Sequence, residues 1–170
     1  MRIGLLFFLL TSPVFAQSAS TTAVSLAACG PADVKFDVKD DPTPPASDIP
    51  AGKALIYIIE DVGASSYGWI TIRVGLDGTW IGANRGNSYF SFLVSPGERH
   101  ICANWQSSAR NQSSLYSFTN FTPEPGKTYY FRTQIWFSNS MSRIELNRIN
   151  SDEGQYQLAV FPLVASHPKK

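Results

Sequence analysis

Charged side chains are scarce in this sequence. Of its 170 residues, 16% are Asp, Glu, Lys or Arg, and the formal net charge is only +1. An average soluble domain has about a quarter of its residues charged. Proteins that hold nucleic acid through its phosphates carry a basic stripe, and contact with an anionic membrane surface needs a basic cluster. The sequence has neither, so it predicts no nucleic-acid partner and no polybasic membrane contact.

Histidine is rarer still, which limits the chemistry open to the chain. His167 lies in the C-terminal tail "SHPKK", and His100 lies two residues before Cys102. A zinc site needs three or four clustered ligands, and the GxSxG motif of many serine hydrolases is missing. The acidic residues between 39 and 48 fall in a proline-rich stretch, where solvated charges are expected rather than a calcium site. We therefore predict no catalytic residue, no metal, no cofactor and no enzymatic activity.

Two adjacent carboxylate pairs bear on glycoside hydrolysis, which uses two converging acids. They are Glu60-Asp61 and Asp152-Glu153. Neighbouring side chains of a strand point to opposite faces of the sheet, so neither pair converges locally. Both pairs are predicted to be charges at strand ends.

Long hydrophobic runs are confined to the N-terminus, where "IGLLFFLLTSPVF" follows Arg2. This run is shorter than the roughly 20 apolar residues that span a bilayer. Pro13 interrupts it, and Val14-Phe15-Ala16 places small residues at the positions that a signal peptidase recognises. Residues 1–16 are therefore predicted to be a signal peptide, with export to the periplasm or the medium after cleavage behind Ala16.

Cysteine is limited to Cys29 and Cys102, and two interpretations of Cys29 are open. Residues 26–29, "LAAC", match a lipobox, which would make the protein an outer-membrane lipoprotein anchored through Cys29 and give it a membrane partner. However, the polar spacer 17–22 would then have to lie in the hydrocarbon, where it is costly to bury. An even number of cysteines in an exported chain favours a disulfide, so Cys29–Cys102 is the predicted bond.

Short alternating segments fill most of the remaining chain, and none sustains a capped helical period. "KALIYIIE" is apolar on both faces, as in a central strand, and Asp77-Gly78 marks a tight hairpin turn. These patterns predict an all-β fold, a single antiparallel β-sandwich of about nine strands, immunoglobulin-like or prealbumin-like. The expected strands are "DVKFDVK", "KALIYIIE", "WITIRV", "SYFSFLV", "RHICANW", "SSLYSFTNF", "TYYFRTQIWF", "RIELNRI" and "YQLAVF", with "VGLDGTWIG" as a hairpin.

The predicted organisation is a signal peptide at 1–16, a flexible leader at 17–32, a sandwich domain at 33–165 with a proline-rich crossover at 39–52, and a basic tail at 166–170. Within the strand Arg99–Trp105, Ile101, Ala103 and Trp105 share one face and Cys102 lies on the other. If the apolar set faces the core, Cys102 points outward. The disulfide would then fasten the leader across the outside of a sheet.

Three segments resemble a known family: "GKALIYIIED", "VGLDGTWIGANRGNSYFSFLVSPGERHICANW" and "EPGKTYYFR". Together they are similar to the bacterial secreted domain of unknown function 2846, over roughly residues 34–161. The resemblance implies a small prealbumin-like or immunoglobulin-like sandwich exported to the cell envelope. Some relatives are lipoproteins, and no activity is implied.

Aromatic residues are the one surplus, at 13% of the chain. By alternation, four of them fall on faces opposite the core, and outward aromatic rings can stack on sugars or contact proteins. The alternative is that the leader or loops cover these faces. The chain is thus predicted to be a binding or structural module for an envelope protein or glycan, with carbohydrate binding or carbohydrate-active chemistry as the competing function. The possible ligand face comprises Trp69, Trp80, Tyr130 and Trp136.

Overall fold

The computed structural model describes residues 28–43, 48–63, 69–107, 114–137 and 142–170. The predicted signal peptide and most of the leader lie outside these residues. Ten strands and one helix make up the described chain: β1 Phe36–Asp40, β2 Ala54–Glu60, β3 Thr71–Leu76, β4 Thr79–Arg85, β5 Ser88–Val94, β6 Arg99–Trp105, β7 Tyr116–Phe121, β8 Thr128–Phe137, β9 Ser142–Ile149, α3 Ser151–Val160 and β10 Val164–Pro168.

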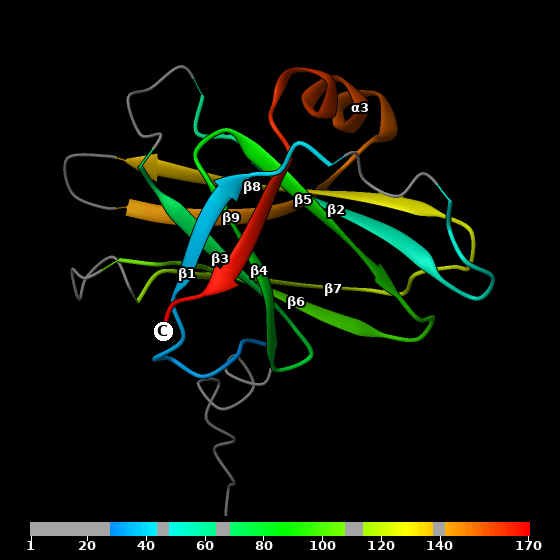
Figure 1. Cartoon of the computed structure of the whole chain (residues 1–170). Helices are drawn as coiled ribbons and strands as arrows, with labels where there is room; N and C mark the ends of the chain where they lie inside the picture. Colours follow the sequence, from blue (N-terminus) through cyan, green and yellow to red (C-terminus); the bar gives the residue numbers. More distant parts are fainter. Residues whose placement is uncertain (1–27, 44–47, 64–68, 108–113, 138–141) are drawn as a thin grey trace, which may run out of the picture.

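The strands form two four-stranded sheets packed face to face, with a separate two-stranded ribbon (Figure 1). One sheet has the order β5-β2-β8-β9 and is called the β2 sheet here; the other, β4-β3-β6-β7, is called the β3 sheet. The ribbon joins β1 to β10 near opposite ends of the described chain. The predicted all-β sandwich is confirmed.

One pairing differs from the all-antiparallel prediction, because β2 and β8 run parallel. Between these two strands the chain forms β5 of the same sheet and all four strands of the other one. It then returns beside β2 in the same direction. A parallel pair needs such a long crossover, and alternation within each strand says nothing about strand direction.

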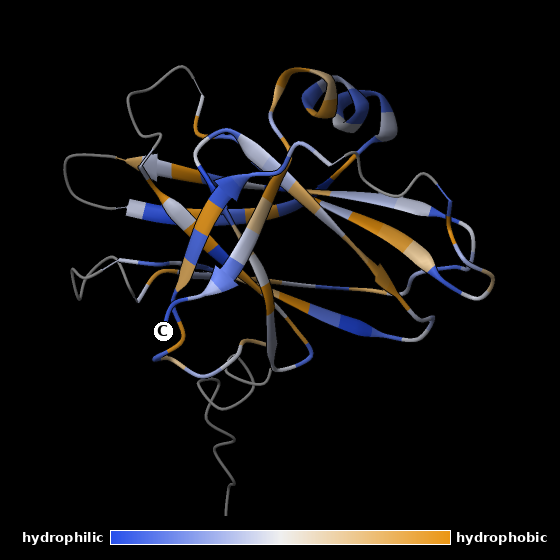
Figure 2. Cartoon of the chain, viewed as in Figure 1, coloured by the Kyte–Doolittle hydropathy of each residue, from blue (hydrophilic) through white to orange (hydrophobic). Residues whose placement is uncertain are grey.

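The core lies between the sheets, and β2 is buried along its whole length, as predicted for a central strand. Alternate residues of β2, such as Ile56 and Ile58, face the β3 sheet, and the others, such as Tyr57, face the opposite side. Hydrophobic and hydrophilic residues alternate along several strands (Figure 2). The main cluster comprises Ala54, Ile56, Ile58, Ile70, Ile72, Val74, Phe90, Val94, Ile101, Ala103, Trp105, Tyr129, Phe131, Ile144, Leu146 and Val164.

The helix α3 corrects the prediction that this region is a strand, "YQLAVF". The side chain of Asn150 caps it by accepting a hydrogen bond from the amide of Glu153 at 2.9 Å. Gly154 lets the helix approach Tyr130 closely, since a Cβ there would overlap the ring. Only Gly154 and Gln157 of α3 are buried. The helix therefore lacks the apolar stripe by which a helical period is detected.

Candidate functional site

The disulfide between Cys29 and Cys102 is present, with the two Cα atoms 5.3 Å apart. Cys102 lies on the outer face of β6, and both cysteines are buried with Ala28 beneath Trp80 and Tyr116. The sequence prediction of this bond, and of its position outside the sheet, is confirmed. A sulfur in a disulfide cannot carry the thioether of a lipoprotein, so this bond counts against an anchor at Cys29. Disulfides persist in oxidising compartments, which indicates a location outside the cytosol.

Trp80 makes further contacts that hold the leader on the outer face of the β3 sheet. Its indole Nε1 donates to the carbonyl of Pro31 at 2.7 Å. Gly30 lies directly on the ring, where a Cβ would overlap the indole. The guanidinium of Arg73 stacks on the ring, 4.3 Å from its centroid. Trp80 therefore contacts the leader and does not present its ring to a ligand.

Arg73 is a buried cation that links the leader to two strands. Its Nε donates to Asn104 Oδ1 at 3.1 Å, and its Nη1 donates to the carbonyl of Ala32 at 3.1 Å and to that of Val34. Burial lowers the pKa of its guanidinium, and Tyr116 and Asp33 oppose this shift. Backbone carbonyls and an amide thus satisfy this charge. Its role in the fold is to hold the leader in place.

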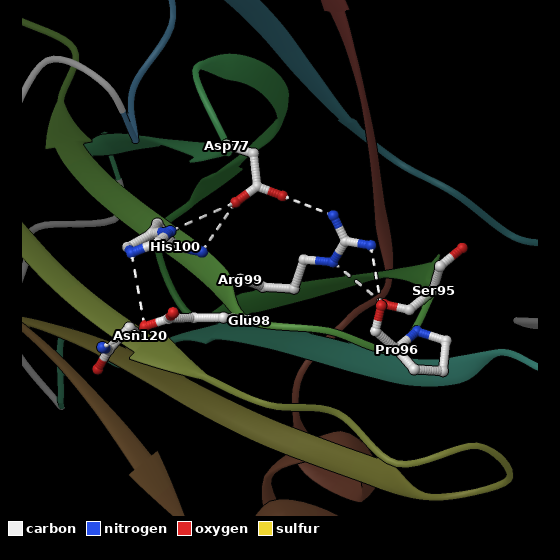
Figure 3. Close-up of polar contacts among 7 residues, drawn as sticks. All are labelled: Asp77, Ser95, Pro96, Glu98, Arg99, His100 and Asn120. Carbon is white, nitrogen blue, oxygen red and sulfur yellow. Dashed lines mark hydrogen bonds and ion pairs between the residues drawn. The ribbon is translucent and has the colours of Figure 1, made fainter.

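A polar cluster that includes a histidine surrounds Asp77 at the turn between β3 and β4 (Figure 3). Asp77 Oδ2 pairs with Arg99 Nη1 at 3.0 Å, and Asp77 Oδ1 accepts from the backbone amide of His100 at 2.9 Å. Asp77 itself has φ of 49°, and Gly78 follows at 86°, as predicted for the hairpin. The carboxylate therefore joins its own turn to the start of β6.

His100 makes this cluster look like a catalytic or metal site, but the geometry does not support either. Its Nδ1 lies 3.7 Å from Asp77 Oδ1, whereas Nε2 lies 3.9 Å from Glu98 Oε1. The two carboxylates are therefore on opposite edges of the ring and cannot converge on one ion. Across the described residues, no group of three or more His, Cys, Asp or Glu side chains is placed to hold a metal.

The four aromatic residues predicted as a ligand face do not share one surface. Trp80 lies under the leader on the β3 sheet. Tyr130 is buried on the β2 sheet, where it stacks on Tyr57 with centroids 5.4 Å apart and is covered by α3. Trp69 is 56% exposed and lies 6.1 Å from the buried Trp105. Trp80 and Tyr130 therefore have a packing role in the fold. Of these three residues, Trp69 alone has an exposed ring.

Trp136 is the member of the set that borders a pocket. Its side chain is 49% exposed on the β2 sheet, beside a hollow of about 210 Å³. Arg143 of the neighbouring strand lies 5.5 Å from the ring centroid. The hollow is lined by Asp61, Val62, Gly63, Gln134, Ile135 and Trp136. Two larger hollows elsewhere in the described chain, of about 520 and 310 Å³, have no exposed aromatic ring in their linings.

Asp61 gives this pocket a carboxylate in a fixed position. Its Oδ1 accepts from the amide of Gly63 at 3.0 Å, and its Oδ2 accepts from Gln157 Nε2 at 3.1 Å. Gln157 is a buried residue of α3, so the helix orients the carboxylate. The sequence predicted Asp61 only as a strand-end charge. Two features of the sequence could have indicated the pocket. Asp61 directly follows a buried strand, and Gln134 and Trp136 are two residues apart and so lie on one face of their strand.

Glu60, the neighbour of Asp61, points the opposite way and is fully buried between the sheets. Burial raises the pKa of its carboxyl well above the ordinary value of 4.5, although the backbone amides of Ile72 and Gly86 oppose the rise. These amides lie close to the carboxyl, but neither of its oxygens makes a hydrogen bond of normal geometry among the described residues, and the amide of Gly86 already donates to the carbonyl of Ile70. This confirms that Glu60 and Asp61 diverge, and it removes Glu60 from any surface chemistry.

Comparison with known proteins adds no assignment: no family model matches the chain, and no curated protein matches it. The resemblance to the secreted domain of unknown function 2846 therefore stays a prediction. Within the described residues, no helix is long and apolar enough to cross a membrane. The fold and the Trp136 pocket are thus the basis for a functional proposal.

Proposed function

We propose that this protein is an exported, non-enzymatic module of the bacterial cell envelope that binds a glycan at the Trp136 pocket. The observation that carries the proposal is an exposed indole beside a fixed carboxylate and an amide in one small hollow. The disulfide and the signal-peptide pattern of residues 1–16 support a location outside the cytosol.

The chemistry of the pocket suits a sugar ring. The axial C–H groups of a pyranose form an apolar face that packs against an aromatic ring, while its hydroxyl groups seek hydrogen bonds. Trp136 offers the ring, Asp61 offers acceptor oxygens, and Gln134 can both donate and accept. A few polar groups beside apolar surface is the usual composition of a small-molecule site.

The same pocket argues against hydrolysis of the glycan. Glycosidases of the common type use two carboxyl groups on either side of the scissile bond. The pocket lining contains Asp61 but no second carboxylate, and the adjacent Glu60 is buried in the core. Glu145, opposite Gln134 on the neighbouring strand, is held in an ion pair with Arg143 at 2.8 Å. The geometry therefore favours binding over catalysis.

Glycan binding is tested with bacterial peptidoglycan, as insoluble sacculi for co-sedimentation and as soluble fragments for NMR. The indole N–H resonance of Trp136 is expected to shift on titration with the fragments, because the sugar packs on its ring. Trp136→Ala should lower the affinity about tenfold or more, equivalent to about 1.4 kcal/mol. Co-sedimentation of this variant should fall correspondingly.

Trp69→Ala is the matched control, because Trp69 is at least as exposed as Trp136 but lies outside the pocket lining. It should leave affinity unchanged. Equal loss in both variants would point to nonspecific adsorption through exposed aromatics. Absence of binding by the wild-type protein to sacculi and to N-acetylglucosamine oligomers would overturn the proposal and favour a protein-binding or structural role.

A further inference from the structure

Strand β7 is an edge strand of the β3 sheet, bonded to β6 on one side. The amide of Trp105 donates to the carbonyl of Leu115, so this pair is a hydrogen-bonded one. In an antiparallel ladder, hydrogen-bonded pairs alternate with pairs whose N–H and C=O groups point away from the partner strand. The register therefore directs the N–H and C=O groups of Tyr116, Phe118 and Asn120 away from β6. Among the described strands, none pairs with this side of β7.

The other edges of the sandwich are partly covered or charged. On the β4 and β5 side, Ser166 of β10 accepts from the amide of Ala83 at 2.9 Å, and the carbonyl of Pro162 accepts from the amide of Tyr89 at 3.0 Å. Edge strand β9 carries Arg143, Glu145 and Arg148. Charge and coverage are common protections against edge-to-edge association. Strand β7, "YSFTNF", has neither protection in the part of the chain that the structure describes.

The exposed surface of β7 is aromatic as well as uncharged. Phe118 is 43% exposed and stacks on Tyr116, with centroids 6.0 Å apart and an angle of 7° between the rings. Both side chains lie on the outer face of the β3 sheet, because Phe118 is opposite Cys102. An edge strand with free backbone groups and an exposed phenylalanine, stacked on the half-buried Tyr116, can accept a further strand.

We propose that β7 pairs with β7 of a second copy of this chain, in an antiparallel dimer with its two-fold axis at Phe118. This register sets Phe118 opposite its counterpart and sets Tyr116 opposite Asn120 of the other copy. Each free backbone donor then meets a free acceptor, and no like charges meet, because the strand has no charged residue. A two-fold interface uses the same patch on both copies, and β7 is complementary to itself in this way. The inference is independent of the glycan pocket.

The test is sedimentation velocity of the exported wild-type protein over a wide range of concentration. A reversible monomer–dimer equilibrium is expected. Phe118→Lys should raise the dimer dissociation constant at least tenfold, because two lysines would then face each other across the axis. Leu93→Lys is the matched control: Leu93 is 42% exposed on the edge strand β5, and its substitution should leave the equilibrium unchanged.

Hydrogen exchange keeps the test independent of any folding defect in the variants. In the wild-type protein, the amides of Tyr116, Phe118 and Asn120 should become protected as the concentration rises. A wild-type protein that stays monomeric at every concentration would overturn the proposal. So would a dimer in which these three amides exchange as fast as in the monomer, or a Phe118→Lys variant that dimerises like the wild type.

Discussion

A variant in which both cysteines are replaced, Cys29→Ser/Cys102→Ser, is expected to unfold with a free energy about 4 kcal/mol lower than that of the wild type. The bond joins residues that are 73 positions apart, and closing a long loop restricts the unfolded chain strongly. The loss is large compared with the total stability of a typical domain, about 5–15 kcal/mol. It should also loosen the leader, which would then depend on its contacts with Trp80 and Arg73.

Guanidinium unfolding of the oxidised wild type, the reduced wild type and the double variant measures this effect. The reduced protein and the variant should have the same lowered midpoint, with little change for the variant when reductant is added. Because both cysteines are almost fully buried, reduction of the native protein should be slow and should track unfolding. Equal stability of the oxidised wild type and the variant would show that the loop closure has no effect.

Strand alternation in the sequence was enough to place the disulfide. Cys102 was predicted to lie on the outer face because Ile101, Ala103 and Trp105 form the apolar face of the same strand, and the structure has this arrangement. The central position of β2 followed similarly from its apolar residues on both faces. These features could be predicted because a strand places successive side chains on opposite faces.

What covers an outward face could not be predicted in the same way. Trp80 and Tyr130 both point away from the core, as their alternation indicated, but the leader covers the first and α3 covers the second. Both covers depend on distant segments of the chain. The leader has no alternating pattern, and α3 is anchored by a glycine and a glutamine rather than by an apolar stripe. The Trp136 pocket likewise depends on bringing Asp61, which follows β2, next to Gln134 of β8.

Glu60→Gln is expected to stabilise the protein at neutral and alkaline pH, by about 1–3 kcal/mol, the usual cost of an unsatisfied buried polar group. The wild-type carboxylate is fully buried, and its oxygens lack partners in the described structure. The nearby side chain of Asn84 donates to the carbonyls of Ile58 and Ser88 at 3.2 and 2.7 Å, which leaves its own oxygen unpaired. A glutamine at position 60 carries no charge, and its amide adds hydrogen-bond donors near the unpaired side-chain oxygen of Asn84.

The pH dependence separates this effect from a change in packing. Burial raises the pKa of Glu60 in the folded state above 4.5, the ordinary value that applies in the unfolded chain. As pH rises from 4.5 towards the folded-state pKa, the unfolded chain releases this proton while the folded chain keeps it, so the free energy of unfolding falls. Below 4.5 both states hold the proton and this loss is absent.

The difference in unfolding free energy between Glu60→Gln and the wild type should therefore be small in acid, grow as pH rises above 4.5, and level off above the folded-state pKa. Urea unfolding of both proteins over this pH range measures it, and the subtraction cancels the titration of groups that the two share. Thr133→Val is a useful companion, because Thr133 is buried beside Glu60 and its hydroxyl does not titrate in this range. Its effect should be independent of pH. A Glu60→Gln variant that becomes less stable relative to the wild type as pH rises would mean that the carboxylate is ionised and held by partners, contrary to the buried position of its two oxygens.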